Sequence, residues 1–426
     1  MVTLVTATDF LLLISVTLLL GYIGSLLESK TKVPNLVWLL SFGLLIGPVF
    51  RLYDPSFFLQ ISPLMSAVAL AIVLFDAGIN LDLKSVTKAL PKSAALVTFT
   101  FLLSVLSIGG FLHFFMSQDF TLLQGLLLGT MVGGNSTVTV LTILHSLEKT
   151  MDISIDAKTI LTLEPTLADP VCIVSAITLI RMIISPETSL TSGITTLLFG
   201  FVLSAILGLI IGLVWAIILD RLYGRHLNYL ITIAVLFLTY LLSEEFVGHG
   251  AGPVACLVFG LVLTNFSGIL ERFGEYKTVI IEKEELRRFH EEITFFIESF
   301  FFVYVGIIVS ISIKHLTVGW IVVGICLAAR QGAVSLAASF TNFTEEERIL
   351  SRAVMADGLP ALIMSQLPAI YDPQQQYFTT TGIYPNLCFI IVLSTVIYAS
   401  LVGPYLAQKR LNSSGKTQTD SSHIRL

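Results

Sequence analysis

Charged side chains are scarce in this chain of 426 residues: Asp, Glu, Lys and Arg make up 12% of it, whereas hydrophobic residues make up 55%. The mean hydropathy of +0.88 lies far outside the range of soluble globular domains. This shortage of charge excludes a soluble protein, and nothing in the net charge of -5 indicates binding to nucleic acid. The composition is that of an integral membrane protein, whose first partner is the lipid bilayer.

Cysteine and short catalytic motifs are also scarce. The four cysteines lie in four different apolar segments, without the spacing of a zinc site or a disulfide framework, so we expect packing residues. They are Cys172, Cys256, Cys326 and Cys388.

The first ten residues lack the basic residues of a signal peptide and contain Asp9 instead, which predicts that the first apolar segment is retained. Neither Gly-x-Gly-Asp nor Gly-x-Ser-Gly occurs, so an intramembrane protease, and an enzyme in general, is not expected.

Long apolar runs are abundant. A bilayer core about 30 Å thick requires about 20 apolar residues per helix, and a window of that length finds thirteen candidate spans. They are 10–27, 33–50, 61–81, 93–115, 121–145, 158–182, 190–220, 227–243, 250–267, 290–313, 316–340, 351–371 and 377–408. Cytoplasmic loops concentrate Lys and Arg, and twenty of the 24 basic residues fall in alternate loops or in the tail. This alternation predicts an all-α protein of thirteen transmembrane helices with an external N-terminus and a cytoplasmic C-terminus.

Two of these spans contain residues that break helices. Span five includes the run TMVGGNSTVTV, and span twelve includes MADGLPALIM. The two lie seven spans apart, so they cross the membrane in opposite directions, as in an inverted repeat. The predicted organisation is a first six-helix repeat at 1–189, a linker helix at 190–220, a second repeat at 221–408 and a polar tail at 409–426. Broken helices at matching positions of two repeats indicate an ion site near the midplane of a transporter.

Ionisable side chains inside the spans mark the candidate site, because each costs at least about 2.5 to 3.5 kcal/mol at the bilayer centre. Asp169 precedes Pro170, which has no N–H and so leaves the carbonyl of Thr166 without its helical partner. A buried carboxylate beside free carbonyls can bind either a proton or a dehydrated cation, and that competition is the basis of antiport. Glu164 lies about 140° around the helix from Asp169. We therefore expect Glu164 to pair with Arg330 and to hold span six against span eleven.

The roles of the other acids are less defined. Asp76, in LFDAGINLDL, is either a satisfied or water-facing acid or a part of the transport site. Glu244, Glu245 and Glu298 are expected at interfacial or packing positions.

Several segments resemble, in the same order along the chain, those of cation:proton antiporters of the NhaP and NHE type. These are VWLLSFGLLIGPVF, LFDAGINLDL, LEPTLADP, SFFFVYVGIIVS and AARQGAVSL. The resemblance covers nearly the whole chain. It implies a homodimer, a thirteen-helix inverted repeat and elevator-like movement of a core bundle containing spans five, six, twelve and thirteen. It also implies that Asp169 binds both the proton and the cation, with Glu164 and Arg330 as a supporting pair.

The chain departs from the family's pattern at four places, of which one is Pro165, where a Ser often follows the Glu. Ala168 stands where an Asn usually precedes the aspartate, and the break of span five carries Asn135 and Ser136 where many members have Thr-Asp-Pro. Span twelve has Asp-Gly-Leu-Pro from Asp357 onwards, where many members show Gly-x-Arg-Gly. A second carboxylate is thereby lost from span five, and Asp357 is a candidate to restore it from the opposite broken helix.

The sequence thus predicts a multi-pass protein of the cell membrane that exchanges a monovalent cation, first of all Na⁺, for H⁺ by alternating access. Asp169 is expected to bind both ions, with Asn135, Ser136 and Asp357 as co-ligands of the cation, and no cofactor is expected. One strongly coupled carboxylate favours one-for-one exchange, which a titrating Asp357 would alter. Li⁺ and K⁺ stay open as substrates. The alternatives are a K⁺/H⁺ antiporter and a passive cation channel, which would carry current without proton counterflow.

Overall fold

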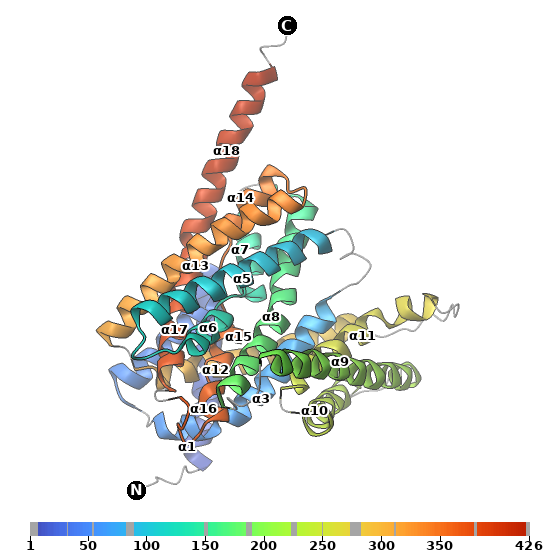
Figure 1. Ribbon diagram of the computed structural model, residues 1–426. Coiled ribbons are helices and arrows are strands. Elements are labelled where there is room, and N and C mark those ends of the chain that lie inside the picture. The colour runs from blue at the N-terminus through green and yellow to red at the C-terminus, as the bar shows by residue number, and fades with distance from the viewer. Residues whose placement is uncertain are drawn as a thin grey trace.

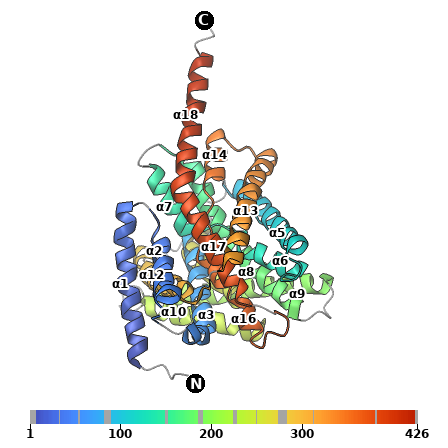
Figure 2. The same cartoon turned by 90° about the vertical axis from the view of Figure 1, so that its left-hand side faces the viewer.

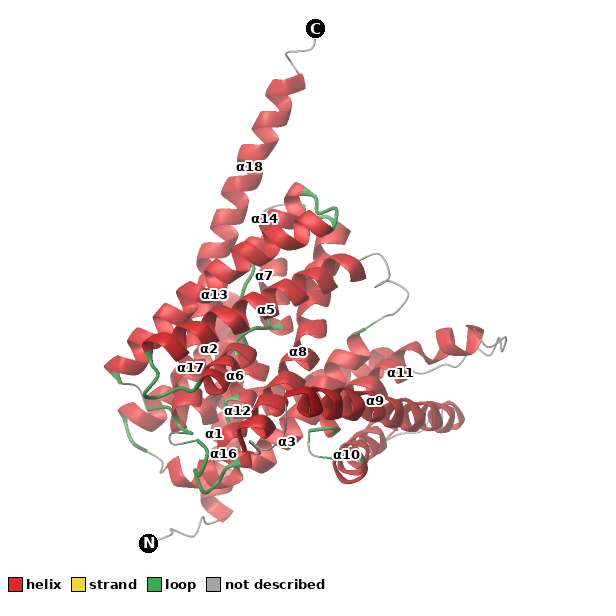
Figure 3. Ribbon diagram, viewed as in Figure 1, coloured by secondary structure: helices red, strands yellow, loops and turns green. Residues whose placement is uncertain are grey.

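The structure is a computed structural model made of helices (Figure 1). It describes residues 7–31, 33–52, 55–81, 89–148, 152–184, 190–222, 228–248, 250–272, 283–310, 312–378 and 381–422. Within these ranges every regular element is a helix, as Figure 3 shows, which confirms the predicted all-α class. The first helix begins and the last one ends at opposite ends of the molecule (Figures 1 and 2), as expected for an odd number of membrane crossings.

The first half of the chain folds into helices at the positions of the six predicted spans and one linker. They are α1 (Ala7–Thr31), α2 (Asn35–Leu44) with the π-helical turn η1 (Leu45–Val49), α3 (Pro55–Asn80), α5 (Leu90–Phe115), α6 (Leu122–Met131), α7 (Thr137–Glu148), α8 (Ile155–Ile184) and α9 (Leu190–Arg221). The break predicted in span five separates α6 from α7. Pro165 and Pro170, by contrast, both lie inside α8, which continues through them.

The second half repeats this arrangement of long helices and one broken span. Its helices are α10 (Asn228–Phe246), α11 (Gly252–Arg272), α12 (Lys283–Ile308), α13 (Ile313–Phe340), α14 (Glu345–Ala353), α15 (Leu359–Met364), α16 (Leu367–Tyr371), α17 (Ile383–Ile397), η2 (Tyr398–Val402) and α18 (Gly403–Ser422). The break predicted in span twelve separates α14 from α15. Helix α18 continues through most of the predicted polar tail, because no proline follows Pro404 to end it.

The hydropathy of these helices is that of a polytopic membrane protein. Among the described residues, six helices are long and apolar enough to cross a bilayer, and shorter apolar helices accompany them. The shorter ones are found where the predicted spans are broken or end in a π-helical turn, and also in α3 and α11. The count of thirteen crossings and their orientation stay predictions.

Two helix crossings bring backbones together at glycine residues. Gly43 of α2 faces Gly306 of α12, where a Cβ on Gly306 would lie 2.8 Å from the Cα of Gly43. Gly78 of α3 faces Gly260 of α11 in the same manner, and a Cβ on Gly260 would lie 2.6 Å from a carbonyl oxygen of α3. Small residues of this kind allow close packing of helices in membranes. In the predicted repeat α2 corresponds to α11 and α3 to α12, so one crossing would be the copy of the other.

The two breaks lie in the interior, enclosed by the long helices. Helix α5 packs against α6, α8 and α13, and α13 in turn packs against α17. The segment 354–358 between α14 and α15 is buried along its whole length. The core thus surrounds the part of the backbone that has no helical hydrogen bonds.

Candidate ion site

The two broken helices cross each other, as the sequence predicted. The backbone N–H of Ser136 donates to the carbonyl oxygen of Ala356 at 2.7 Å, and the N–H of Ala356 donates to Oδ1 of Asn135 at 2.7 Å. Gly358 packs so tightly against Ser136 that a Cβ on Gly358 would collide with the serine hydroxyl. Lipid offers no hydrogen bonds, so each break satisfies polar groups that the other leaves open.

Helix α8 places Asp169 beside this crossing. The side chain is 5% exposed, and its Oδ1 lies 3.9 Å from the position that a Cβ on Gly134 would occupy. Thr166, close to one turn earlier on α8, lines the same cavity as Asp169. The carboxylate of Asp169 therefore lies next to the break of span five, as the sequence predicted.

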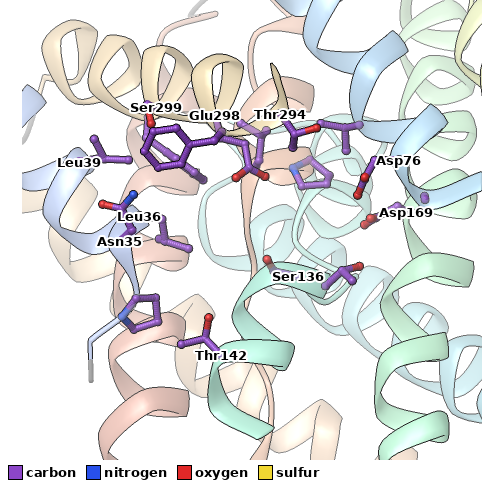
Figure 4. A pocket seen from close by; sticks show the side chains of 18 of the residues that line it. Asn35, Leu36, Leu39, Asp76, Ser136, Thr142, Asp169, Thr294, Glu298 and Ser299 are labelled. Carbon is purple, nitrogen blue, oxygen red and sulfur yellow. The ribbon is translucent and has the colours of Figure 1, made fainter. Parts of the chain in front are cut away.

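Asp169 lines a cavity of about 200 Å³ that is rich in acids (Figure 4). Asp76 from α3 and Glu298 from α12 line it as well, and Glu28 from α1 is a further lining residue. Of the described residues that line the cavity, none is Lys, Arg or His. Several acids on low-dielectric walls create a negative potential, which raises the local concentration of cations.

Asp76 is held by a chain of polar contacts that leads away from the cavity. Nε2 of His290 lies 3.4 Å from Oδ1 of Asp76, and Nδ1 of the same ring lies 2.7 Å from the hydroxyl of Tyr229. The ring of Phe75 packs edge-on against His290 with centroids 5.1 Å apart. Three helices, α3, α10 and α12, thus fix the position of this carboxylate.

The predicted co-ligands are divided between the cavity and the crossing. Ser136 lines the cavity, whereas Asn135 uses its amide oxygen to accept the N–H of Ala356. Asp357 is not among the cavity-lining residues. Its N–H donates to Oγ1 of Thr395 at 3.2 Å, and that hydroxyl lies 3.4 Å from Oδ2 of Asp357. The carboxylate of Asp357 is therefore in contact with the hydroxyl of Thr395 on α17, and it also lies within electrostatic range of Asp169. Its expected role as a co-ligand stays a prediction.

The predicted pair of Glu164 and Arg330 is present and deeply buried. The two side chains form a bidentate contact, in which Nη2 of Arg330 lies 2.8 Å from Oε2 of Glu164 and Nη1 contacts Oε1. Arg330 also donates to two carbonyl oxygens at the end of α14, those of Ser351 at 2.6 Å and Val354 at 3.2 Å. The pair thus joins α8 to α13 and also closes the end of the broken helix, where carbonyls lack helical partners.

Three of the four acids in the cavity were not assigned to the site from the sequence. Glu28 was not singled out, Asp76 was left between two roles, and Glu298 was expected at an interfacial or packing position. A usable signal existed on α12, where Thr294, Glu298 and Phe302 recur at every fourth residue and all line the cavity. Which acids share one cavity depends on how α3 and α12 pack, and that packing is not encoded in local spacing.

Comparisons with known proteins identify the family and the fold. The family model for the transmembrane part of sodium/hydrogen exchangers matches residues 14–408. A K(+)/H(+) antiporter, NhaP, from Alkalimonas amylolytica is 22% identical over 421 residues, which are 96% of this chain and 69% of that protein. The Na(+)/H(+) antiporter 1 of Methanocaldococcus jannaschii is 21% identical over 433 residues, which are 96% of this chain and 98% of that protein. The solved structure of the sodium proton antiporter MjNhaP1 from the same organism, at pH 8, has a similar fold: the TM-score is 0.77 at 19% identity, with 94% of this chain and 99% of that chain covered.

Proposed function

Because the chain belongs to the sodium/hydrogen exchanger family, we propose that it exchanges a monovalent cation, first of all Na⁺, for H⁺ across the cell membrane. The observation that carries this proposal is Asp169, a carboxylate that is 5% exposed, lies beside the crossing of two broken helices and lines a cavity. Exchange of ions across a membrane, rather than catalysis on a substrate, is the activity of this family.

Proton and cation compete for Asp169. Burial favours the neutral, protonated carboxyl, whereas a cation in the cavity favours the carboxylate, so binding of one ion releases the other. Alkali cations are hard ions that prefer oxygen ligands. The hydroxyls of Ser136 and Thr166 line the cavity with Asp169 and are the oxygens that we assign to the dehydrated cation.

Asp76 and Glu298 act on the same cation from two other helices. They come from α3 and α12, whereas Asp169 and Ser136 come from α8 and the break before α7. We assign to them the attraction of cations into the cavity, because a group of carboxylates that line one cavity focuses a negative potential there. In an elevator-like movement the crossing and α8 would slide past α3 and α12, so these two acids would face Asp169 in one state only.

K⁺ is the second candidate cation. The observation that favours it is the relative from Alkalimonas amylolytica, whose name describes K(+)/H(+) exchange. The choice between the two ions depends on the size of the cage around Asp169 and on the number of its oxygens.

The test is cation-driven proton movement in proteoliposomes that contain a pH-sensitive dye. Na⁺, Li⁺ and K⁺ are added in turn to vesicles with an imposed pH gradient, for the wild type and for Asp169→Asn. We expect at least one cation to dissipate the gradient in the wild type and none to do so in the variant.

Two controls separate antiport from its alternatives. A potassium-valinomycin clamp holds the membrane potential constant in the Na⁺ and Li⁺ arms, so that proton movement under the clamp identifies exchange and not a passive current. Asp372→Asn is a matched control, because this acid caps its own loop by accepting the N–H groups of Gln376, Tyr377 and Phe378 and does not line the cavity. A wild type that moves no protons with any of the three cations would contradict the proposal.

A further inference from the structure

A second cavity, separate from the ion site, lies between α13, α14 and the last helix. Its volume is about 360 Å³, within the range of small-ligand sites. Its walls are mainly apolar and include Leu327, Ala328 and Leu406, while Arg352 and Arg410 supply positive charge. No Asp or Glu is among its described lining residues. The helices that form it lie side by side in Figures 1 and 2.

The groove runs from the middle of the membrane toward the end that the basic residues predict to be cytoplasmic. Its lining extends along the last helix from Tyr398 to Arg410, which is roughly 18 Å at 1.5 Å per residue. Arg352 lies at the inner end, since Ser351 accepts a hydrogen bond from Arg330 and the carbonyl of Arg352 accepts one from Gln331. Arg410 lies at the outer end and is exposed.

Arg352 is a half-buried cation whose side-chain hydrogen-bond partner is neutral. Its Nη2 donates to Oγ of Ser335 at 2.9 Å, and within the described part of the chain no carboxylate lies in salt-bridge distance of Arg352 or Arg410. The other deep arginine, Arg330, is neutralised by Glu164. An arginine inside a membrane normally pairs with an anion or lines a wet cavity, because its desolvation is costly.

We propose that this groove binds an anionic phospholipid from the leaflet that faces the cytoplasm. The phosphate would be held between the guanidinium groups of Arg352 and Arg410, which are suited to bidentate contacts with phosphate oxygens. One acyl chain would lie along the apolar wall beside Leu327, Ala328 and Leu406. The apolar length of the groove is what selects a lipid over a soluble phosphate.

The site would connect lipid composition to the ion site through α14. That helix carries Arg352 and ends at Ala353, and the next residues form the extended segment that crosses the break of span five. A lipid bound between α14 and α18 would restrain the outer arm of this broken helix.

The experiment measures thermal unfolding of the purified full chain in a zwitterionic detergent at constant sodium concentration. Dioleoylphosphatidylglycerol, dioleoylphosphatidylcholine and inorganic phosphate are added separately. We expect phosphatidylglycerol to raise the unfolding midpoint of the wild type by about 5 °C, and the other two additives to leave it unchanged. This readout does not depend on transport, so it succeeds or fails independently of the proposed exchange activity.

Three variants locate the effect. Arg410→Gln, at an exposed position, and Ala328→Phe, which fills the groove without a change of charge, should each reduce the shift to less than half. Arg348→Gln is the matched control, because it removes an exposed charge from the same helix α14 outside the groove. An equal shift in Arg410→Gln and in the wild type would overturn the proposal, and so would an equal effect of inorganic phosphate, which would indicate a site for soluble anions.

Discussion

At the scale of single residues, the acids of this chain divide by where their carboxylates point. Asp76, Asp169 and Glu298 line one cavity, whereas Asp357 is turned toward Thr395 on α17. Under the proposed function, Asp76 on α3 and Glu298 on α12 take the place of the carboxylate that is lost from span five relative to the family's pattern.

Asparagine substitutions should separate these acids. We expect Asp76→Asn to raise the apparent KM for the cation at least about tenfold. The variant loses one favourable charge interaction in a partly desolvated site, and each loss of about 1.4 kcal/mol weakens binding tenfold. Asp357→Asn should change it less than about threefold, because its amide can keep the contact with Thr395. Initial rates of dequenching over a range of cation concentrations give both values. A larger effect of Asp357→Asn than of Asp76→Asn would instead support Asp357 as a ligand.

The buried pair of Glu164 and Arg330 should matter for stability more than for ion affinity. Arg330→Gln leaves Glu164 as a buried charge without its partner, which costs about 3 to 5 kcal/mol in buried pairs. We expect this variant to unfold well below the wild type in a detergent thermal-shift assay. Arg330→Lys should restore only part of the loss, since an ammonium group cannot reproduce the bidentate contact or the bonds to Ser351 and Val354. Full stability of Arg330→Gln would contradict the supporting role.

Only those features of the site that depend on the residues of a single segment could be predicted from the sequence. The crossing, Asp169 and the Glu164–Arg330 pair follow from helix breakers and from the cost of deep charges, which are properties of single segments. The partners of Asn135 and the direction of Asp357 depend on how two breaks interlock, and their spacing contains no information about that. For the same reason the contribution of Glu298 was assigned to packing.

At the scale of helices, the positions of the two helix breaks could be predicted from the sequence. That α8 continues through its two prolines was harder to predict. Gly, Asn and Ser end α6, and Asp, Gly and Pro separate α14 from α15, as the runs in spans five and twelve indicated. Pro165 and Pro170 stay inside α8, because a membrane helix can lose single backbone bonds when neighbouring groups compensate. The helix pairs α2 with α12 and α3 with α11 each have a glycine on both sides. The inverted repeat itself stays a prediction.

The glycine crossings give a test at this scale. Gly306→Val should destabilise the protein by about 1 to 3 kcal/mol, as expected for overpacking, because its side chain would meet the backbone of Gly43 and Leu40. Gly260→Val should have a similar effect at the α3 and α11 crossing. Gly324→Val on α13 is the control, since a Cβ there meets nothing within 4 Å. The unfolding midpoint in detergent is the readout, and equal midpoints for Gly306→Val and Gly324→Val would argue against tight crossings.

At the scale of the whole molecule, the cavity opens toward one side of the predicted membrane. Its lining includes Asn35 at the start of α2 and Asn80 at the end of α3, which adjoin loops that the basic residues place in the cytoplasm. If this orientation holds, the conformation exposes Asp169 to the cytoplasm.

Cysteine labelling from the two sides of the membrane tests this orientation. The four native cysteines are buried, so a membrane-impermeant maleimide should modify Asn80→Cys only in inside-out vesicles. Gln118→Cys, exposed in the turn between α5 and α6, should be modified only in right-side-out vesicles. The increase in apparent mass on gels caused by the attached maleimide measures the labelling of both variants. The opposite pattern would invert the predicted topology, and labelling from both sides would show that the cavity does not close to the exterior.

The crossing of the two broken helices has a consequence for how such a protein can change its substrate. One of its hydrogen bonds joins backbone groups of Ser136 and Ala356, and the other needs from a side chain only the oxygen of Asn135. Neither bond uses the side chain of Ser136, which lines the cavity. A change of this cavity-lining side chain can therefore alter the ligands of the ion while both hydrogen bonds of the crossing stay in place.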